Sequence, residues 1–86
     1  MDKKYFVYIL ECADKTLYTG IAVDIEKRLS EHNSDSGKGA KYTRYRQPVK
    51  LVWKMEIDNK SLALKEEYRI KQLTKKEKEN LIKNIK

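Results

Sequence analysis

The sequence has little cysteine and no long apolar run. Its single cysteine, Cys12, excludes a disulfide within the chain and a cysteine-rich zinc site. No apolar stretch approaches the roughly 18 residues that a membrane-spanning helix needs. The N-terminus lacks the apolar region and cleavage site of a signal peptide. These absences predict a cytoplasmic protein.

Glycine and proline are scarce as well, with three copies and one copy. Gly37, Gly39 and Pro48 all fall within residues 33–48, which predicts one long loop there. No internal repeat or linker divides the chain, so we expect a single domain spanning residues 1–86. A chain of this size buries only about 60–65% of the surface of its unfolded form, so its core is small.

Acidic side chains are the minority charge, 13 against 20 basic ones, which gives a net charge of +7. This balance favours a polyanionic partner, most often nucleic acid, although many small basic proteins have none. The excess is concentrated between Asp35 and Glu56, where no acid occurs. The basic residues of this segment are Lys38, Lys41, Arg44, Arg46, Lys50 and Lys54.

Aromatic and glycine residues are interleaved with this positive charge. Tyr42 and Tyr45 lie among the basic residues, and Gly37 and Gly39 allow backbone N–H groups to approach phosphate closely. Basic residues with intervening aromatics can hold a phosphate backbone and stack an exposed base. The alternative is a solvated flexible loop with excess lysine.

Hydrophobic patterns and caps predict the order β-β-α-β-α-α. The expected strands span 4–11, 16–21 and 49–57, and the expected helices run from Asp24 to about Asn33, over 61–73, and from Thr74 to near Lys86. The predicted fold is α+β, a small mainly antiparallel three-stranded sheet packed with helices. Alternation in the third strand predicts one face made by Val49, Leu51, Trp53 and Met55.

The two predicted N-terminal strands each carry a tyrosine, Tyr8 and Tyr18, around a turn at Asp14-Lys15. A three-residue loop at residues 13–15 would pair position 8 with 20 and 10 with 18, which places both phenols on one face. A two-residue loop would pair 8 with 21 and place them on opposite faces. Tyrosine is also an ordinary strand residue, and the sequence leaves both registers open.

The first predicted helix places Arg28 and His32 one turn apart beside its only apolar stripe. An inward arginine is costly unless an anionic group meets it. The simpler interpretation is that Arg28 pairs with a local carboxylate and His32 fills space. In the second helix, Glu67 lies near the middle of the apolar arc, where a carboxylate should pair with a cation such as Arg28, protonate, or bind a metal such as Mg²⁺.

These positions together resemble the GIY-YIG nuclease superfamily, and most closely its small stand-alone bacterial members. The two motifs are Val7-Tyr8-Ile9 and Tyr18-Thr19-Gly20, and Arg28, His32 and Glu67 follow in order. The resemblance covers nearly the whole chain and includes the loop text GKGAKYTRYRQPVKLV. The chain differs from some superfamily nucleases in having no lysine at residues 21–23, and only Asn80 or Asn84 as a loose match to a terminal asparagine.

The resemblance implies an endonuclease that hydrolyses DNA phosphodiesters with one divalent ion, Mg²⁺ or Mn²⁺, in DNA repair or processing. Glu67 would bind the ion, Arg28 would contact the scissile phosphate, and Tyr8, Tyr18 and His32 would orient or deprotonate the attacking water. Tyr8 is the first choice of general base, which requires the metal or Arg28 to lower its pKa. The predicted substrate-binding residues are Gly20, Lys38, Lys41, Tyr42, Arg44 and Arg46.

Two other functions are compatible with the same residues. One is a nucleic-acid-binding module on this fold that has weak turnover or none. The other is a small basic interaction protein whose charge serves ribosomal or protein partners.

Overall fold

The computed structural model describes residues 4–34, 43 and 45–84 of the chain. The described elements are β1 (Tyr5–Glu11), β2 (Leu17–Ala22), α1 (Ile25–His32), β3 (Lys50–Ile57), α3 (Lys60–Lys71) and α4 (Lys75–Lys83). The predicted α+β class and the order β-β-α-β-α-α are confirmed. None of the described helices is long and apolar enough to cross a membrane.

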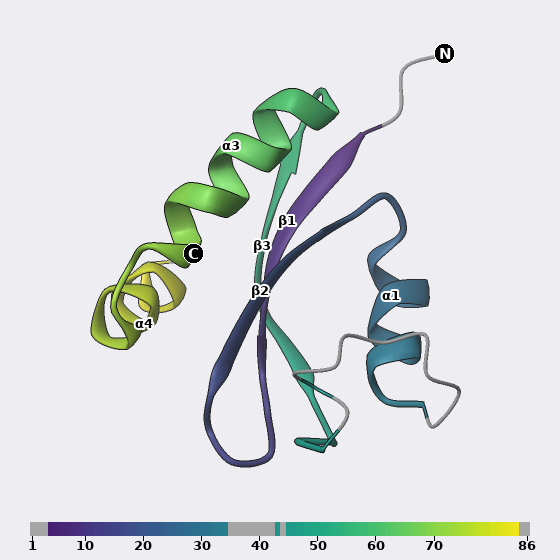
Figure 1. The fold of residues 1–86 in the computed structure, drawn as a ribbon, viewed down its shortest axis with the longest axis vertical. Helices are drawn as coiled ribbons and strands as arrows, with labels where there is room; N and C mark the ends of the chain where they lie inside the picture. Colours follow the sequence, from purple (N-terminus) through teal and green to yellow (C-terminus); the bar gives the residue numbers. More distant parts are fainter. Residues whose placement is uncertain (1–3, 35–42, 44, 85–86) are drawn as a thin grey trace.

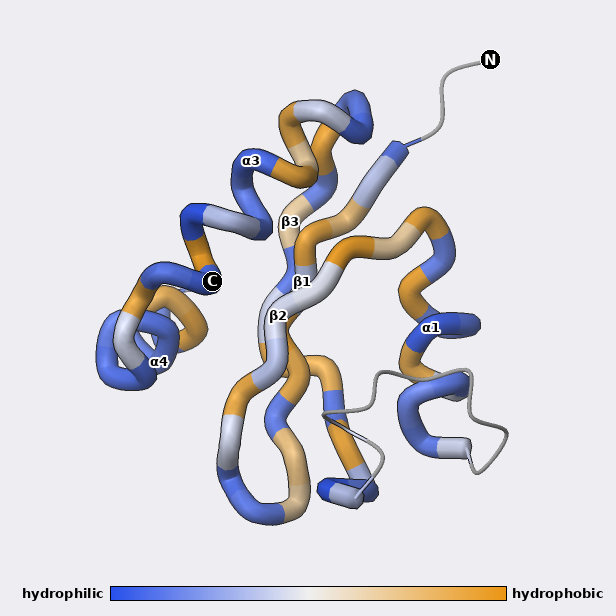
Figure 2. Tube along the Cα trace, viewed as in Figure 1, coloured by the Kyte–Doolittle hydropathy of each residue, from blue (hydrophilic) through white to orange (hydrophobic). Residues whose placement is uncertain are grey.

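The sheet has the strand order β2-β1-β3, and both pairings are antiparallel. Helix α1 lies on one side of the sheet, and α3 and α4 lie on the other (Figure 1). β1 is therefore the central strand, covered on both faces, which agrees with its nearly continuous apolar sequence. Hydropathy follows this arrangement, because the strands are largely apolar and the turn between β1 and β2 is hydrophilic (Figure 2).

The hairpin between β1 and β2 has the three-residue loop. The Cys12 N–H donates to the Thr16 carbonyl at 2.9 Å, and the Lys15 N–H donates to the Cys12 carbonyl at 2.9 Å. Lys15 takes the left-handed conformation with φ 70° that such a loop requires at its last position. Consequently Tyr8 pairs with Gly20, and position 10 pairs with Tyr18. Both phenols lie on the same face of the sheet.

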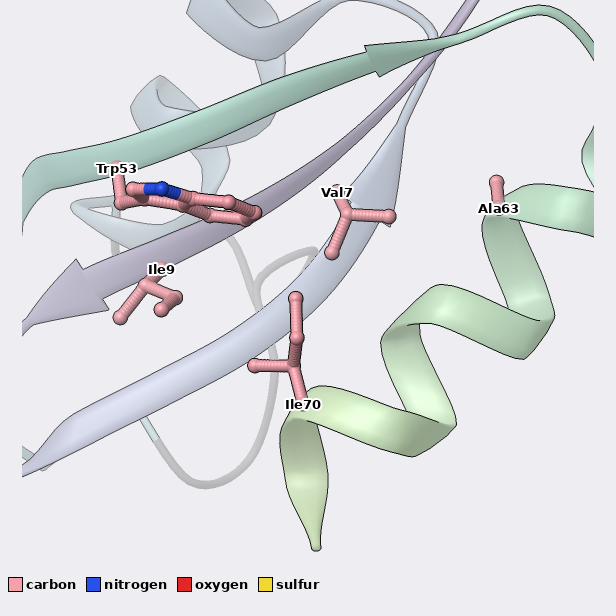
Figure 3. Packing of buried hydrophobic residues seen from close by; sticks show 5 residues of the cluster. All are labelled: Val7, Ile9, Trp53, Ala63 and Ile70. Carbon is pink, nitrogen blue, oxygen red and sulfur yellow. The ribbon is translucent and has the colours of Figure 1, made fainter. Parts of the chain in front are cut away.

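The two faces of the sheet carry separate apolar clusters. On the α3 side, side chains from β1, β3 and α3 meet between the sheet and the helix (Figure 3). The buried members of that cluster are Val7, Ile9, Trp53, Ala63 and Ile70. On the α1 side, Tyr8, Leu10, Cys12 and Val49 form the buried cluster, with Ile25 and Leu29 of α1 packed against it.

The predicted single apolar face of β3 is wrong. The pairing of β1 with β3 shifts between Ile9 and Leu10, so that Ile9 lies opposite Trp53 and Leu10 lies opposite Leu51. One extra residue, Val52, is thereby inserted into β3, and a one-residue insertion reverses which face the following side chains point to. Trp53 therefore joins the cluster under α3, whereas Leu51 packs on the α1 side.

α1 and α4 begin where their capping residues predict. The Asp24 carboxylate accepts the Lys27 N–H at 3.1 Å at the start of α1. Thr74 and Glu77 form both hydrogen bonds of the predicted capping box at the start of α4. α3 starts one residue earlier than predicted, because the Asn59 side chain accepts the Leu62 N–H at 2.9 Å and caps it.

The described end of the predicted long loop is tied to the C-terminus of α1. The Asn33 amide donates to the Val49 carbonyl at 3.0 Å and accepts the Val49 N–H at 2.7 Å. The Gln47 amide donates to the carbonyls of His32 at 2.8 Å and Ser34 at 3.1 Å. These side chains supply partners to backbone groups that the end of the helix and the loop leave unpaired.

Candidate active site

The register of the three-residue hairpin loop places the Tyr8 phenol directly over Gly20. A Cβ at position 20 would lie 2.6 Å from the Tyr8 oxygen and 3.2 Å from Cε2 of Tyr18. No other residue fits without moving the phenol, since real Cβ atoms do not approach other atoms this closely. Gly20 is thus needed for the position of Tyr8, in addition to any contact with substrate.

His32, the last residue of α1, faces both tyrosines. Its Nε2 lies 3.0 Å from the Tyr8 oxygen, and its ring centroid lies 5.2 Å from that of Tyr18, at an edge-to-face angle of 61°. Tyr8 is 2% exposed and His32 is 1% exposed. The structure therefore brings these three sequence-predicted residues together in a nearly dry environment.

Arg28 lies one helical turn before His32 and has two partners of different kinds. Its guanidinium pairs with the Glu31 carboxylate at 3.0 Å, which is the local ion pair that the simpler interpretation of the sequence expects. It also forms a hydrogen bond with Tyr8. Because a guanidinium has five N–H donors, Arg28 can interact with several groups at once.

The electrostatic environment keeps the two contacting groups neutral. Burial raises the pKa of Tyr8 to about 12, and the hydrogen bond from Arg28 opposes this effect without overcoming it. Burial also lowers the pKa of His32 to about 4, and the positive charge of Arg28 lowers it further. At neutral pH Tyr8 is therefore a phenol and His32 is a neutral imidazole with one lone pair.

Glu67 approaches from the other side of the sheet. It lies on α3, its side chain is 19% exposed, and its carboxylate pairs with the Lys71 ammonium at 3.3 Å. Its negative charge nevertheless contributes to the raised pKa of Tyr8, so the carboxylate acts electrostatically on the phenol across the hairpin. β2 is an outer strand of the described sheet, and α3, which carries Glu67, packs on the face opposite to Tyr8.

A single carboxylate limits which metal could bind. Within residues 4–34, 43 and 45–84, no three His, Cys, Asp or Glu side chains are grouped so that they could hold an ion. That excludes a described zinc site with three protein ligands, but it fits Mg²⁺, which keeps most of its waters and takes further oxygens from substrate phosphate. On the face of β2 that α3 covers, the Thr19 hydroxyl is buried with no partner in the described part of the chain.

The described part of the basic loop lies against the hairpin turn. The Arg46 side chain pairs with the Asp14 carboxylate at 3.1 Å, and its carbonyl accepts the Ala13 N–H at 2.9 Å. Tyr45 is strongly exposed. The other predicted substrate-binding residues of the loop, Lys38, Lys41, Tyr42 and Arg44, lie outside the described residues.

The sequence model of the GIY-YIG catalytic domain matches residues 4–80. The chain belongs to the GIY-YIG family. The match extends from the start of β1 into α4 and includes every described residue of the candidate site. In this GIY-YIG domain, Tyr8 of the first motif and Tyr18 of the second share one face of the hairpin, with His32 against both.

Several proteins of known sequence or structure are similar to this chain over most of their length. The chain is 60% identical to a UPF0213 protein of Syntrophus aciditrophicus, over 93% of this chain and 91% of that protein. It is 55% identical to the UPF0213 protein YsiG of Lactococcus lactis, over 94% of this chain and 77% of that protein. Among solved structures, it resembles the protein EF2693 of E. faecalis, with 41% identity and a TM-score of 0.64 over 96% and 88%. It also resembles the UPF0213 protein BH0048 of Bacillus halodurans, with 44% identity and a TM-score of 0.59, over 93% of this chain and 83% of that chain.

One residue of the candidate site carries no sequence signal. Thr43 is fully buried, and its Oγ1 lies 2.7 Å from Nδ1 of His32. It stands eleven positions after His32 in the predicted loop, a spacing that corresponds to no helical or strand period. A threonine between Tyr42 and Arg44 reads as part of a solvated basic segment, so only the three-dimensional structure reveals the contact.

Proposed function

We propose that this chain is a divalent-metal-dependent DNA endonuclease that acts in the cytoplasm in DNA repair or processing. The observation that carries the proposal is the 3.0 Å contact between the Tyr8 oxygen and Nε2 of His32, between two groups that burial keeps neutral. Arg28 bonds to the same phenol, and Glu67 acts on it from α3. In this proposal His32 supplies an acceptor for a proton, Arg28 a cation for the phosphate and Glu67 a carboxylate for the metal.

Tyr8 serves best as a proton relay between water and His32. Because its pKa lies near 12, it is not a phenolate at neutral pH and cannot be a resting general base. As the water oxygen bonds to phosphorus, a water proton moves to the Tyr8 oxygen and the phenolic proton moves to Nε2 of His32. The bond from phosphorus to the 3′ oxygen breaks with its electron pair on that oxygen. Negative charge developing on the phosphate stabilises the imidazolium.

Arg28 is suited to the phosphate itself. Its fork of donors matches phosphate oxygens, and its side chain is partly exposed at the solvent end of the site. A cavity of about 260 Å³ opens beside it, between the end of β2 and α1. Tyr18 packs its ring against His32 and would keep the imidazole turned toward Tyr8.

Glu67 would hold one Mg²⁺ or Mn²⁺ ion. Such an ion polarises the scissile phosphate and stabilises charge on the leaving oxygen when it is bound. The Lys71 ammonium pairs with this carboxylate at 3.3 Å, so the ammonium and the ion would compete for it.

The DNA partner is inferred from charge. The chain carries a net charge of +7, and Arg46 lies on the described end of the acid-free segment. We propose that Arg46, together with Lys38, Lys41, Tyr42 and Arg44, contacts the DNA backbone, with Gly20 close to the substrate. Binding should then weaken steeply as salt rises, because each neutralised phosphate releases counterions.

Nicking of supercoiled plasmid and a panel of branched DNAs, with and without Mg²⁺ or Mn²⁺, tests the proposal. We expect metal-dependent cleavage that falls by roughly 100-fold or more in Glu67→Gln and Arg28→Ala. Glu66→Gln is the matched control, since Glu66 is the adjacent α3 acid and pairs with Arg69 instead. A wild-type protein that binds DNA in a salt-dependent way but never cuts it would be a binding module on the same fold.

A further inference from the structure

The imidazole of His32 is held at both of its nitrogens by buried hydroxyl groups. The Tyr8 oxygen lies 3.0 Å from Nε2, and Thr43 Oγ1 lies 2.7 Å from Nδ1. All three side chains are at most 2% exposed, so bulk water does not compete for these positions. A short line of hydrogen bonds therefore runs from Thr43 through His32 to Tyr8.

The donors and acceptors in this line assign the tautomer. Arg28 is a donor only, so the Tyr8 oxygen accepts from it and the phenolic proton needs an acceptor elsewhere. Nε2 of His32, at 3.0 Å, supplies that acceptor. A neutral imidazole with its lone pair on Nε2 carries its proton on Nδ1, and Thr43 Oγ1 then accepts the Nδ1–H.

We infer that Thr43 is a positioning residue that fixes His32 as the Nδ1–H tautomer and so keeps the Nε2 lone pair directed at Tyr8. Its place in catalysis rests on the proposed nuclease function, whereas its hold on the tautomer does not. With the opposite tautomer, Nε2 would present an N–H to the phenol. The proton that Tyr8 receives from water would then have no acceptor.

The same segment holds His32 at a second point. Gln47 donates to the His32 carbonyl at 2.8 Å, and the Arg46 N–H donates to the Thr43 carbonyl at 3.0 Å. Arg46 is in turn paired with Asp14 at the hairpin turn. The segment that carries a predicted DNA-contacting cation is therefore bonded to the ring and to the backbone of the proton acceptor. Through Thr43, the position of this segment determines whether the acceptor is correctly oriented.

The tautomer can be measured directly, because His32 is the only histidine in the chain. In ¹⁵N-labelled wild-type protein near pH 7, long-range ¹H–¹⁵N spectra should show a protonated Nδ1 and an unprotonated Nε2. Thr43→Ser keeps the hydroxyl and should preserve this pattern. Thr43→Val removes the hydroxyl at nearly constant shape and should give a mixture or the Nε2–H form.

Kinetics then separate positioning from folding. Thr43→Val should lower kcat by roughly tenfold or more with little change in KM, because a general acid–base step loses its acceptor. Thr43→Ser should remain within roughly threefold of wild type. An Nε2–H tautomer in the wild type overturns the inference, as does Thr43→Val with wild-type tautomer and kcat. If the wild type cuts no DNA, the nuclease proposal fails, while the NMR spectra still decide the tautomer of His32 in the wild type and, through the two Thr43 variants, whether Thr43 sets it.

Discussion

The phenolic oxygen of Tyr8 lies 2.6 Å from the point that a Cβ on Gly20 would occupy, and the two residues are direct partners in the β1–β2 pairing. This relationship connects the second sequence motif to the first. The glycine is required because the tyrosine ring crosses its backbone, and the ring is there because His32 binds its oxygen. The absence of a side chain at Gly20 thus leaves the space that the Tyr8 phenol occupies.

Replacing Gly20 with alanine should displace the phenol from His32. The added Cβ meets Tyr8 Cζ at 2.8 Å as well as the oxygen, and an aromatic ring in a buried cluster cannot easily yield. We expect Gly20→Ala to lower the free energy of unfolding by about 1–3 kcal/mol, measured by urea denaturation. In a Tyr8→Leu background, the same substitution should cost clearly less, because its clash partner is gone. Equal costs in both backgrounds would contradict the proposed clash.

Tyr8→Phe separates the phenol's chemistry from its packing. The ring remains in place, but the hydrogen bonds to His32 and Arg28 are lost. We expect cleavage to fall by roughly 10²–10⁴-fold, the usual contribution of a positioned proton-transfer group, with DNA affinity unchanged. Tyr5→Phe is the control, since Tyr5 packs on the α3 side of the sheet. Cleavage that survives Tyr8→Phe would exclude the relay.

His32 should make the protein less stable in acid. Its pKa is lowered from 6.5 to about 4 on folding. Between these two pH values His32 is protonated in the unfolded chain but stays neutral in the folded protein. The contribution of neutral His32 is fully present above pH 6.5 and declines as pH falls toward 4, by roughly 3 kcal/mol in the limit.

Urea unfolding from pH 4 to 8 would show this effect as a difference in slope between wild type and His32→Asn. Carboxylates titrate in both proteins and cancel in the comparison, although Arg28 and Glu31 face the ring and must remain in place. Identical pH dependence in the two proteins would mean that His32 does not stay neutral in the fold.

Much of the fold follows from local sequence, and the site only in part. Apolar continuity predicts the strands, and Asp24 and Thr74 predict where α1 and α4 start, because these signals act within a few residues. The hairpin turn was undecided, since residues 13–15 are compatible with both loop lengths. The structure decides it through the left-handed conformation of Lys15 and the Cys12–Thr16 hydrogen bond.

The features that the sequence did not predict have one common cause: each depends on contact with a distant part of the chain. The bulge at Val52 arises in the pairing of β3 with β1, so periodicity within β3 misplaces Trp53 and Leu51 relative to each other. Thr43 belongs to the site only because His32 is folded against it. Arg28 was predicted to have either a local ion pair or a role in the site, and it has the ion pair and the contact with Tyr8 together.

The Lys71–Glu67 ion pair should oppose metal binding. Removing the ammonium by Lys71→Gln leaves the carboxylate unpaired and should tighten Mn²⁺ binding by roughly twofold, the small effect expected of a half-exposed ion pair. Calorimetric or paramagnetic titration with Mn²⁺ measures this directly. Lys65→Gln, on the same helix away from Glu67, should leave the affinity unchanged. Weaker Mn²⁺ binding in Lys71→Gln would argue that Glu67 is not the metal ligand.

The double hydrogen bond between the Asn33 side chain and the Val49 backbone has a consequence for the lifetime of the protein. Asparagine before serine is a sequence at which deamidation produces aspartate. That chemical ageing would replace the donor facing the Val49 carbonyl with a charged oxygen, and the two acceptors would repel each other. Asn33 directly follows His32, and Val49 closes the segment that carries Thr43 and Gln47. A single spontaneous lesion at this amide would therefore loosen the proton acceptor without altering either hydroxyl group that contacts its imidazole ring.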